Sequence, residues 1–298
     1  MRTLLVLALL AATAAASAQP DWRPPSGAPS VSLDVIAALG NDLQVADVDG
    51  VGVGTVETTT SALLVSGRIP VGPVTVVAEL PFAYVNYSTG SLSSYDRTGE
   101  STGIGGADAI VGNPYVGVRV STASASLEGG VRLPLSTGDP YDTFADASVV
   151  GPTLDPERFE AYLADVATLS LDARLGRDVV PGVRIEGRLA PALLTETGDA
   201  PDCRACDTVT NGFDVQLGYG VRVVADAGLA RLHAGVGGRR SVTRNRFEAF
   251  DRDASLSLGA SLARAPVRPG VLVRVPVSPG TYFGTKAVVG LSLDVPLR

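Results

Sequence analysis

The sequence predicts an all-β protein, a single closed antiparallel transmembrane β-barrel of about twelve strands that follows an N-terminal signal peptide. Three observations lead to this fold class. Apolar and polar residues alternate along most of the chain, short and long connections alternate between these runs, and 45% of the residues are hydrophobic while only 18% are charged. After the N-terminal segment, no run is continuously apolar for the about 18 residues that a transmembrane helix needs.

The N-terminus has the pattern of a secretory signal. Arg2 supplies a positive charge, residues 4–10 form an apolar core, and Ala16-Ser17-Ala18 is a small-residue cleavage site. The apolar core is too short to cross a bilayer as a helix. We expect a signal peptide over residues 1–18, a Pro-rich and disordered periplasmic tail over 19–30, and one barrel domain over 31–298.

Each strand is predicted from its period-two alternation. In residues 125–135, Leu127 and Val131 fall on one face of the strand, and Glu128 and Arg132 fall on the other. Such runs are longer than the ~5–6 residues of a globular strand and match the ~10 of a tilted membrane strand. In chain order, the predicted strands are 31–39, 56–69, 74–87, 107–121, 125–135, 161–176, 183–196, 212–225, 228–242, 253–265, 270–277 and 284–295.

The connections between these strands alternate in length. Short connections such as 70–73 and 226–227 follow the even strands, whereas longer ones such as 88–106, 136–160 and 197–211 follow most of the odd strands. Outer-membrane barrels have short periplasmic turns and longer external loops. An even number of strands would also return the C-terminus to the periplasm, where the N-terminus begins.

The polar faces of the strands are expected to line the lumen of the barrel, because an arginine on the lipid face near the midplane costs ~2–4 kcal/mol. The predicted lumen residues are Glu79, Arg119, Glu128, Arg132, Asp172, Arg174, Arg184, Glu186, Arg188, Asp214, Gln216, Arg222, Arg231, Arg274 and Asp294. The residues expected to face lipid include Leu127, Val131, Leu133, Leu171, Leu217 and Leu291.

Two interpretations of the charged lumen stay open. The charges can form a network of ion pairs that fills a narrow interior, since buried charges must be paired or hydrated. Alternatively, they can line a water-filled passage in which the excess of arginine favours anionic or polar solutes. A barrel of about twelve strands lies between the smallest filled barrels and the open porins, so the strand number does not decide between them.

Few residues suggest other chemistry. Cys203 and Cys206 lie in a predicted external loop of a secreted protein, which favours a small structural disulfide over a redox pair. His233 is the single histidine, so zinc would lack ligands, and a packed lumen position is expected for it. The net charge of -7 with no basic patch excludes nucleic acid. We predict no enzyme, no metal and no cofactor.

Several short motifs carry a resemblance to a known family. They are Glu79-Leu80-Pro81-Phe82, residues 105–112, residues 132–139 with their Leu-Pro and Thr-Gly-Asp steps, and residues 288–295. Together they resemble the outer-membrane, transporter-like family of the MetA pathway of phenol degradation. This chain departs from that pattern by having Ala107 before Asp108 and by lacking a terminal aromatic residue. The resemblance implies a barrel and uptake of small hydrophobic or aromatic compounds, and it assigns no binding residues.

The sequence therefore supports three hypotheses for a protein of the bacterial outer membrane. The first is passive transport of a small solute, the second is a non-conducting structural or adhesin-like surface barrel, and the third is an outer-membrane hydrolase that uses His233. The expected partners are outer-membrane lipid, a small-molecule solute, and the periplasmic chaperone and barrel-assembly machinery in transit.

Overall fold

The computed structural model describes residues 29–39, 41–46, 53–89, 94–95, 101–102, 105–137, 158–197, 212–243, 253–262, 266–277 and 285–297. The predicted signal peptide and residues 19–28 of the predicted tail lie outside these ranges. Within the part of the chain that is described, no helix has the length and apolarity needed to cross a membrane.

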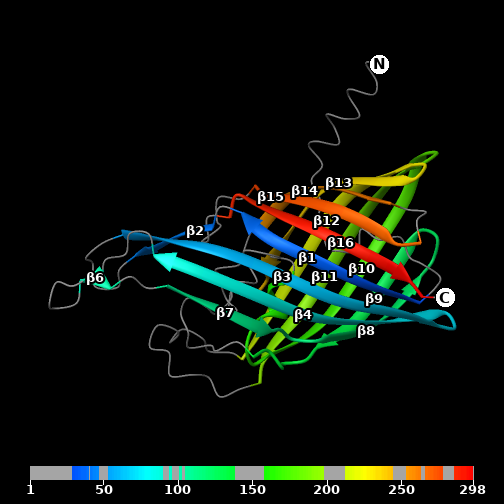
Figure 1. Ribbon diagram of the computed structural model, residues 1–298. Coiled ribbons are helices and arrows are strands. Elements are labelled where there is room, and N and C mark those ends of the chain that lie inside the picture. Colours follow the sequence, from blue (N-terminus) through cyan, green and yellow to red (C-terminus); the bar gives the residue numbers. More distant parts are fainter. Residues whose placement is uncertain are drawn as a thin grey trace.

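The strands form one closed antiparallel barrel of 12 strands, as predicted (Figure 1). The first half consists of β1 (Ser30–Leu39), β3 (Val53–Val71), β4 (Val74–Thr89), β7 (Gly105–Val111) with β8 (Tyr115–Ser121) as one interrupted strand, β9 (Ala125–Arg132) and β10 (Val166–Val180). The second half consists of β11 (Val183–Glu196), β12 (Phe213–Ala227), β13 (Ala230–Ser241), β14 (Asp253–Leu262), β15 (Arg268–Pro276) and β16 (Ala287–Pro296).

The first and last strands close the barrel. β1 pairs with β16 from Ser30 opposite Pro296 to Leu39 opposite Ala287, and its other edge pairs with β3. This closure removes the free sheet edge, whose backbone groups would find no hydrogen-bond partners in lipid. Smaller strands lie beyond the wall: β2 (Asn41–Ala46) pairs with the extended part of β3, and β5 (Ser94–Tyr95) pairs with β6 (Ser101–Thr102).

The two ends of the barrel differ in their connections. Two-residue turns join β3 to β4, β10 to β11 and β12 to β13, and each contains a glycine with positive φ: Gly72, Gly182 and Gly228. The first and last described residues meet at the end of the barrel that carries these turns, where the Leu297 N–H donates to the Pro29 carbonyl at 2.7 Å. We call this the short-turn end; outer-membrane barrels place such short turns in the periplasm. The longer connections leave the opposite, long-loop end.

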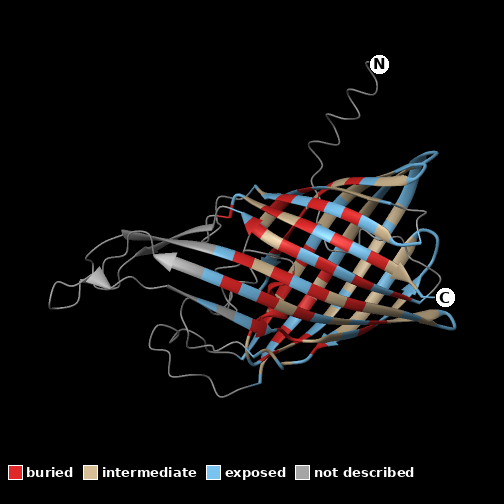
Figure 2. Ribbon diagram, in the orientation of Figure 1, coloured by how far each residue is buried: buried red, intermediate tan, exposed pale blue. Residues whose placement is uncertain are grey.

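Buried and exposed residues alternate along the strands of the wall (Figure 2), and many of the exposed ones are apolar. Leu127, Leu171 and Leu291 are 49%, 42% and 58% exposed, although they lie in the middle of strands. Leu133 and Val131 are also exposed, and Leu217 is half-buried on the same strand face as the exposed Tyr219. In water this surface would be costly, whereas lipid accommodates it. The wall therefore presents an apolar exterior, as expected for a membrane barrel.

The predicted strand bounds differ from the observed ones by a few residues in several places, and three of these differences shape the lumen. Strand 107–121 is interrupted at 112–114, where Pro114 has no N–H to donate to a neighbouring strand. Strand 125–135 ends at Arg132. Strand 161–176 begins at Val166 instead, because the residues before it fold into the barrel rather than along its wall.

Candidate functional site

Residues 158–165, which we call the inward segment, leave the wall and occupy the lumen. They precede β10 and include a 3-10 helix, Phe159–Ala161. The side chains from Arg158 to Leu163 are all buried, with exposures of 6% or less. Asp165 then adopts a positive φ of 54°, a conformation that Asp tolerates better than most residues, and the chain turns sharply into β10.

Asn113, in the break between β7 and β8, holds the inward segment by its side chain. Its Nδ2 donates to the carbonyls of Glu160 at 3.1 Å and Leu163 at 2.6 Å. Its Oδ1 accepts the backbone N–H groups of Leu135 at 2.8 Å and Ser136 at 2.7 Å. The residue is 0% exposed, so these bonds are made where water does not compete for them.

The backbone on either side of Asn113 fits the inward segment closely. The Asn113 N–H donates to the Ala161 carbonyl at 2.6 Å. A Cβ on Gly112 would overlap the same carbonyl oxygen and press on the ring of Tyr162. A glycine at 112 is thus what allows the segment to approach this part of the wall.

An apolar cluster surrounds the inward segment in the long-loop half of the lumen. Tyr162 and Ala161 belong to a cluster with inward-facing residues of β1, β3, β4, β7 and β16, namely Ile36, Ala38, Ala62, Leu64, Ala83, Val85, Ile110 and Val288. Phe159 and Leu163 form a second cluster with residues of β10 and β11. The lumen is therefore not uniformly polar, and packed apolar side chains fill part of its long-loop half.

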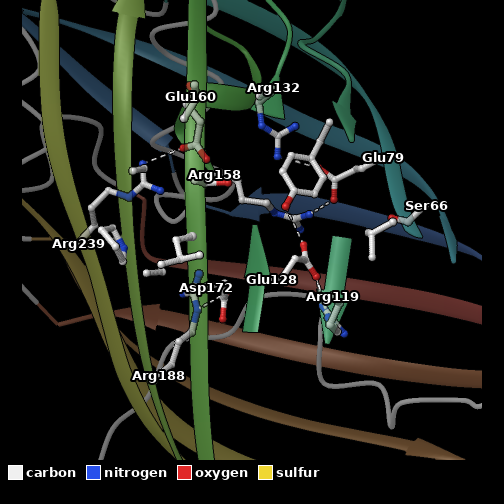
Figure 3. Close-up of a pocket in the computed structure, with 18 of the residues that line it drawn as sticks. Ser66, Glu79, Arg119, Glu128, Arg132, Arg158, Glu160, Asp172, Arg188 and Arg239 are labelled. Carbon is white, nitrogen blue, oxygen red and sulfur yellow. Dashed lines mark hydrogen bonds and ion pairs between the residues drawn. The ribbon is translucent and has the colours of Figure 1, made fainter. Parts of the chain in front are cut away.

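Two buried ion pairs tie the same segment to the wall (Figure 3). The Arg158 guanidinium pairs with Glu79 on β4, and Glu160 accepts from Arg239 on β13 at 2.7 Å. The Arg239 guanidinium also lies over the Phe159 ring, 4.8 Å from its centroid. Because β4 and β13 lie far apart around the barrel, these contacts brace the segment across the lumen.

Three carboxylates inside the barrel are each shared between two arginines. The sets are Glu79 with Arg132 and Arg158, Asp172 with Arg174 and Arg188, and Glu186 with Arg184 and Arg222. In the second and third sets, the nitrogen–oxygen distances run from 2.5 to 3.1 Å. Each set has two positive charges and one negative charge, so the three together give the lumen a positive bias.

Two cavities lie on the short-turn side of the inward segment. The central cavity, of about 80 Å³, reaches the underside of the segment, and its lining includes Glu79, Arg132, Arg158, Glu160, Arg188 and Arg239 (Figure 3). The second cavity, which we call the vestibule, has about 600 Å³ and lies behind the short turns. Arg119 lines both cavities, which places them next to one another.

The residues predicted for the lumen divide among these features. The central cavity is lined by Glu79, Arg119, Glu128, Arg132, Asp172 and Arg188, and the vestibule by Arg119, Arg174, Arg184, Glu186, Arg222 and Arg231. The remaining four, Asp214, Gln216, Arg274 and Asp294, are buried and line neither cavity. Asp214 accepts from Gln216 and Ser241, and Asp294 pairs with Arg268 at 3.6 Å.

Four residues of the site are not predicted from the sequence: Asn113, Arg158, Glu160 and Arg239. Arg158 and Glu160 fall in a predicted loop, where no strand alternation assigns them a direction. Arg239 did carry a usable signal, because it has the same parity along β13 as the predicted lumen residue Arg231.

Tyr115 packs over two glycines that face each other on β8 and β9. Its hydroxyl donates to Glu128 at 2.9 Å, and a Cβ on Gly130 would overlap the ring. We therefore expect Gly130→Ala to cost about 1–3 kcal/mol of stability through overpacking. Combining it with Tyr115→Ala should remove the extra cost, as measured by a double-mutant cycle in urea unfolding. Additive effects of the two substitutions would contradict this packing.

His233, Cys203 and Cys206 were considered above for hydrolysis, metal binding or a disulfide. His233 is buried, and its imidazole packs where a side chain on Gly259 of the next strand would lie. Among the described residues, no group of three or more His, Cys, Asp or Glu side chains gathers where it could hold a metal ion. Cys203 and Cys206 lie outside the described residues, so their disulfide stays a prediction.

Comparisons with known proteins agree on the fold. No family model matches the chain, and no curated protein matches it. An outer-membrane channel from Pseudomonas putida F1 is similar with a TM-score of 0.56 and 9% identity, over 94% of this chain and 100% of that one. The translocator domain of the autotransporter NalP from Neisseria meningitidis has a TM-score of 0.53 and 14% identity, over 93% and 92% of the two chains. With its apolar exterior and closed wall, the chain is a β-barrel of the bacterial outer membrane.

Proposed function

We propose that the protein is a passive conduit for small solutes, and that the inward segment is the element that closes it. The observation that carries this proposal is the arrangement of the lumen. The vestibule and the central cavity lead from the short-turn end to the underside of one segment, beyond which packed apolar residues fill the space. Closure thus depends on a segment that adds no strand to the barrel, while the wall itself is complete.

The nature of the lumen supports small solutes with an apolar part. The inward faces of β1, β3, β4 and β16 carry Ile36, Leu64, Val85 and Val288 in the long-loop half. If the inward segment moves aside, a solute passes these side chains before it reaches the arginines. The resemblance of residues 79–82, 105–112 and 132–139 to the MetA-pathway family supports the same class, small hydrophobic or aromatic compounds.

The test is a planar-bilayer recording of refolded protein that carries Arg158→Gln and Glu160→Gln together. This variant removes both ion pairs to the wall and leaves the net charge unchanged. We expect rare or small openings in the unmodified protein and a severalfold larger mean conductance in the variant. Arg240→Gln, at an exposed position of β13, is the control and should behave like the unmodified protein.

The second candidate function is a non-conducting structural barrel. The packing of Tyr162 and Phe159 against the wall favours it, because a lumen filled in this way also stiffens a scaffold. The same recording separates the two functions. A double variant that stays folded and silent, with no conductance in any preparation, would exclude the conduit and leave the scaffold.

A further inference from the structure

We propose that the vestibule is a binding site for the carboxylate group of a small organic anion, held by Arg184 and Arg222. This inference rests on the proposed function in that the anion would be the solute that enters or leaves the conduit. The site itself can be tested without any transport.

The charges around the vestibule favour an anion. Five arginines line it against three acids, Asp178, Glu186 and Asp226. Asp178 and Asp226 lie at the rim with side chains 75% and 50% exposed, so water screens much of their charge. Glu186 is the one lining acid that faces the interior, and it is shared between two guanidinium groups.

The two arginines around Glu186 are oriented by fixed contacts. Arg184 donates from Nε to Glu186 at 3.1 Å and from Nη2 to the Ala123 carbonyl at 2.8 Å. Arg222 donates from Nε to the other oxygen of Glu186 at 2.6 Å. Arg184 also pairs with Asp178 at 3.3 Å, but the Asp178 side chain is 75% exposed at the rim. A carboxylate that enters the cavity can therefore take the place of this weakly held partner and bind both guanidinium groups.

The size and exposure of the site fit a small organic molecule. The side chains of Arg184 and Arg222 are 26% and 17% exposed, so a solute can reach them from the cavity. The volume of about 600 Å³ lies in the range of small-molecule sites, which is ~300–1,000 Å³. Val224, directly opposite Arg184 on β12, also lines the cavity and offers contact to an apolar body. A carboxylate with an apolar body therefore fits better than a hydrated inorganic ion.

The experiment is calorimetric titration of the refolded protein in detergent with benzoate, and with benzamide as the uncharged molecule of similar shape. We expect benzoate to bind and benzamide to bind at least about tenfold more weakly, because the uncharged amide cannot make charge-assisted hydrogen bonds to two guanidinium groups. Arg184→Gln with Arg222→Gln should lower benzoate affinity about tenfold or more. Arg240→Gln, outside the lumen, should leave it unchanged.

Glu186→Gln provides a test in the opposite direction. It removes the competing carboxylate and keeps both arginines, so benzoate should bind several times more tightly. Heat-dependent mobility on gels, which distinguishes folded from unfolded barrels, verifies the fold of each variant. Equal binding of benzamide, or weaker benzoate binding in Glu186→Gln, would overturn the proposal. Benzoate binding together with a folded but silent Arg158→Gln/Glu160→Gln variant would reject the conduit and keep the site. Conductance of that variant without benzoate binding would do the reverse.

Discussion

Replacing Glu79 by glutamine should lower the free energy of unfolding by about 3–5 kcal/mol, the usual cost of breaking a buried charge pair from one side. The Glu79 carboxylate is shared between Arg132, at 2.9 Å, and Arg158, and the three side chains are only 6–10% exposed. Glutamine would leave two buried guanidinium groups without their counter-charge. Urea unfolding in lipid vesicles, followed by far-UV circular dichroism, measures the effect.

Asp226→Asn is the matched control for this substitution. Asp226 pairs with Arg231 at 2.6 Å, but its side chain is 50% exposed at the short-turn end. Exposed pairs contribute ~0–1 kcal/mol, so the control should unfold close to the unmodified protein. Similar losses in the two variants would show that Glu79 is hydrated and that the ion pair to Arg158 does not hold the inward segment.

Replacing Asn113 by alanine should release the inward segment while the wall of the barrel stays closed. The substitution removes the side chain that bonds Glu160, Leu163, Leu135 and Ser136. Each buried group left without a partner costs about 1–3 kcal/mol. The segment avoids part of this cost when it leaves the lumen. We therefore expect the fraction of molecules with the segment outside the lumen to rise roughly a hundredfold, which corresponds to ~3 kcal/mol.

Hydrogen exchange measured by mass spectrometry on a peptide that covers 158–165 reports this release. Amide exchange in this peptide should accelerate strongly in Asn113→Ala, and exchange in the strands β11 and β12 should not change. Asn86→Ala, at an exposed position of β4, should exchange like the unmodified protein. Unchanged protection of the segment would mean that the apolar cluster around Tyr162 holds it without the Asn113 side chain.

The wall of the barrel was predictable because its signal is local. Alternation in a run such as 183–196 reports which side of the wall each residue faces, and β11 spans this same range. The lengths of the connections show which end of the barrel each one lies at. Short turns such as Pro181-Gly182 are recognisable because they contain a glycine that can adopt a positive φ. Neither signal depends on contacts between residues distant in sequence.

The inward segment could not be predicted because the contacts that hold it in the lumen join residues distant in sequence. Glu160 reaches Arg239, 79 residues away, and Asn113 reaches Leu163 across 50 residues. Parity along a strand assigns Arg132 or Arg188 to one face of the wall. The carboxylate that each arginine contacts depends on the register of the strands and on a loop that folds back into the lumen. The alternation of apolar and polar residues does not encode either of these.

The position of residue 161 tests the central claim, that the inward segment occupies and closes the lumen. Ala161 is 0% exposed and lies against the break at Gly112. A cysteine at 161, with Cys203 and Cys206 replaced by serine, is challenged in lipid vesicles with a water-soluble maleimide. We expect this thiol to be protected in the otherwise unmodified chain and to be labelled readily when Asn113→Ala is added. A cysteine at the exposed Thr137 should be labelled in both backgrounds. Labelling of residue 161 as fast as residue 137 in the unmodified chain would contradict this claim.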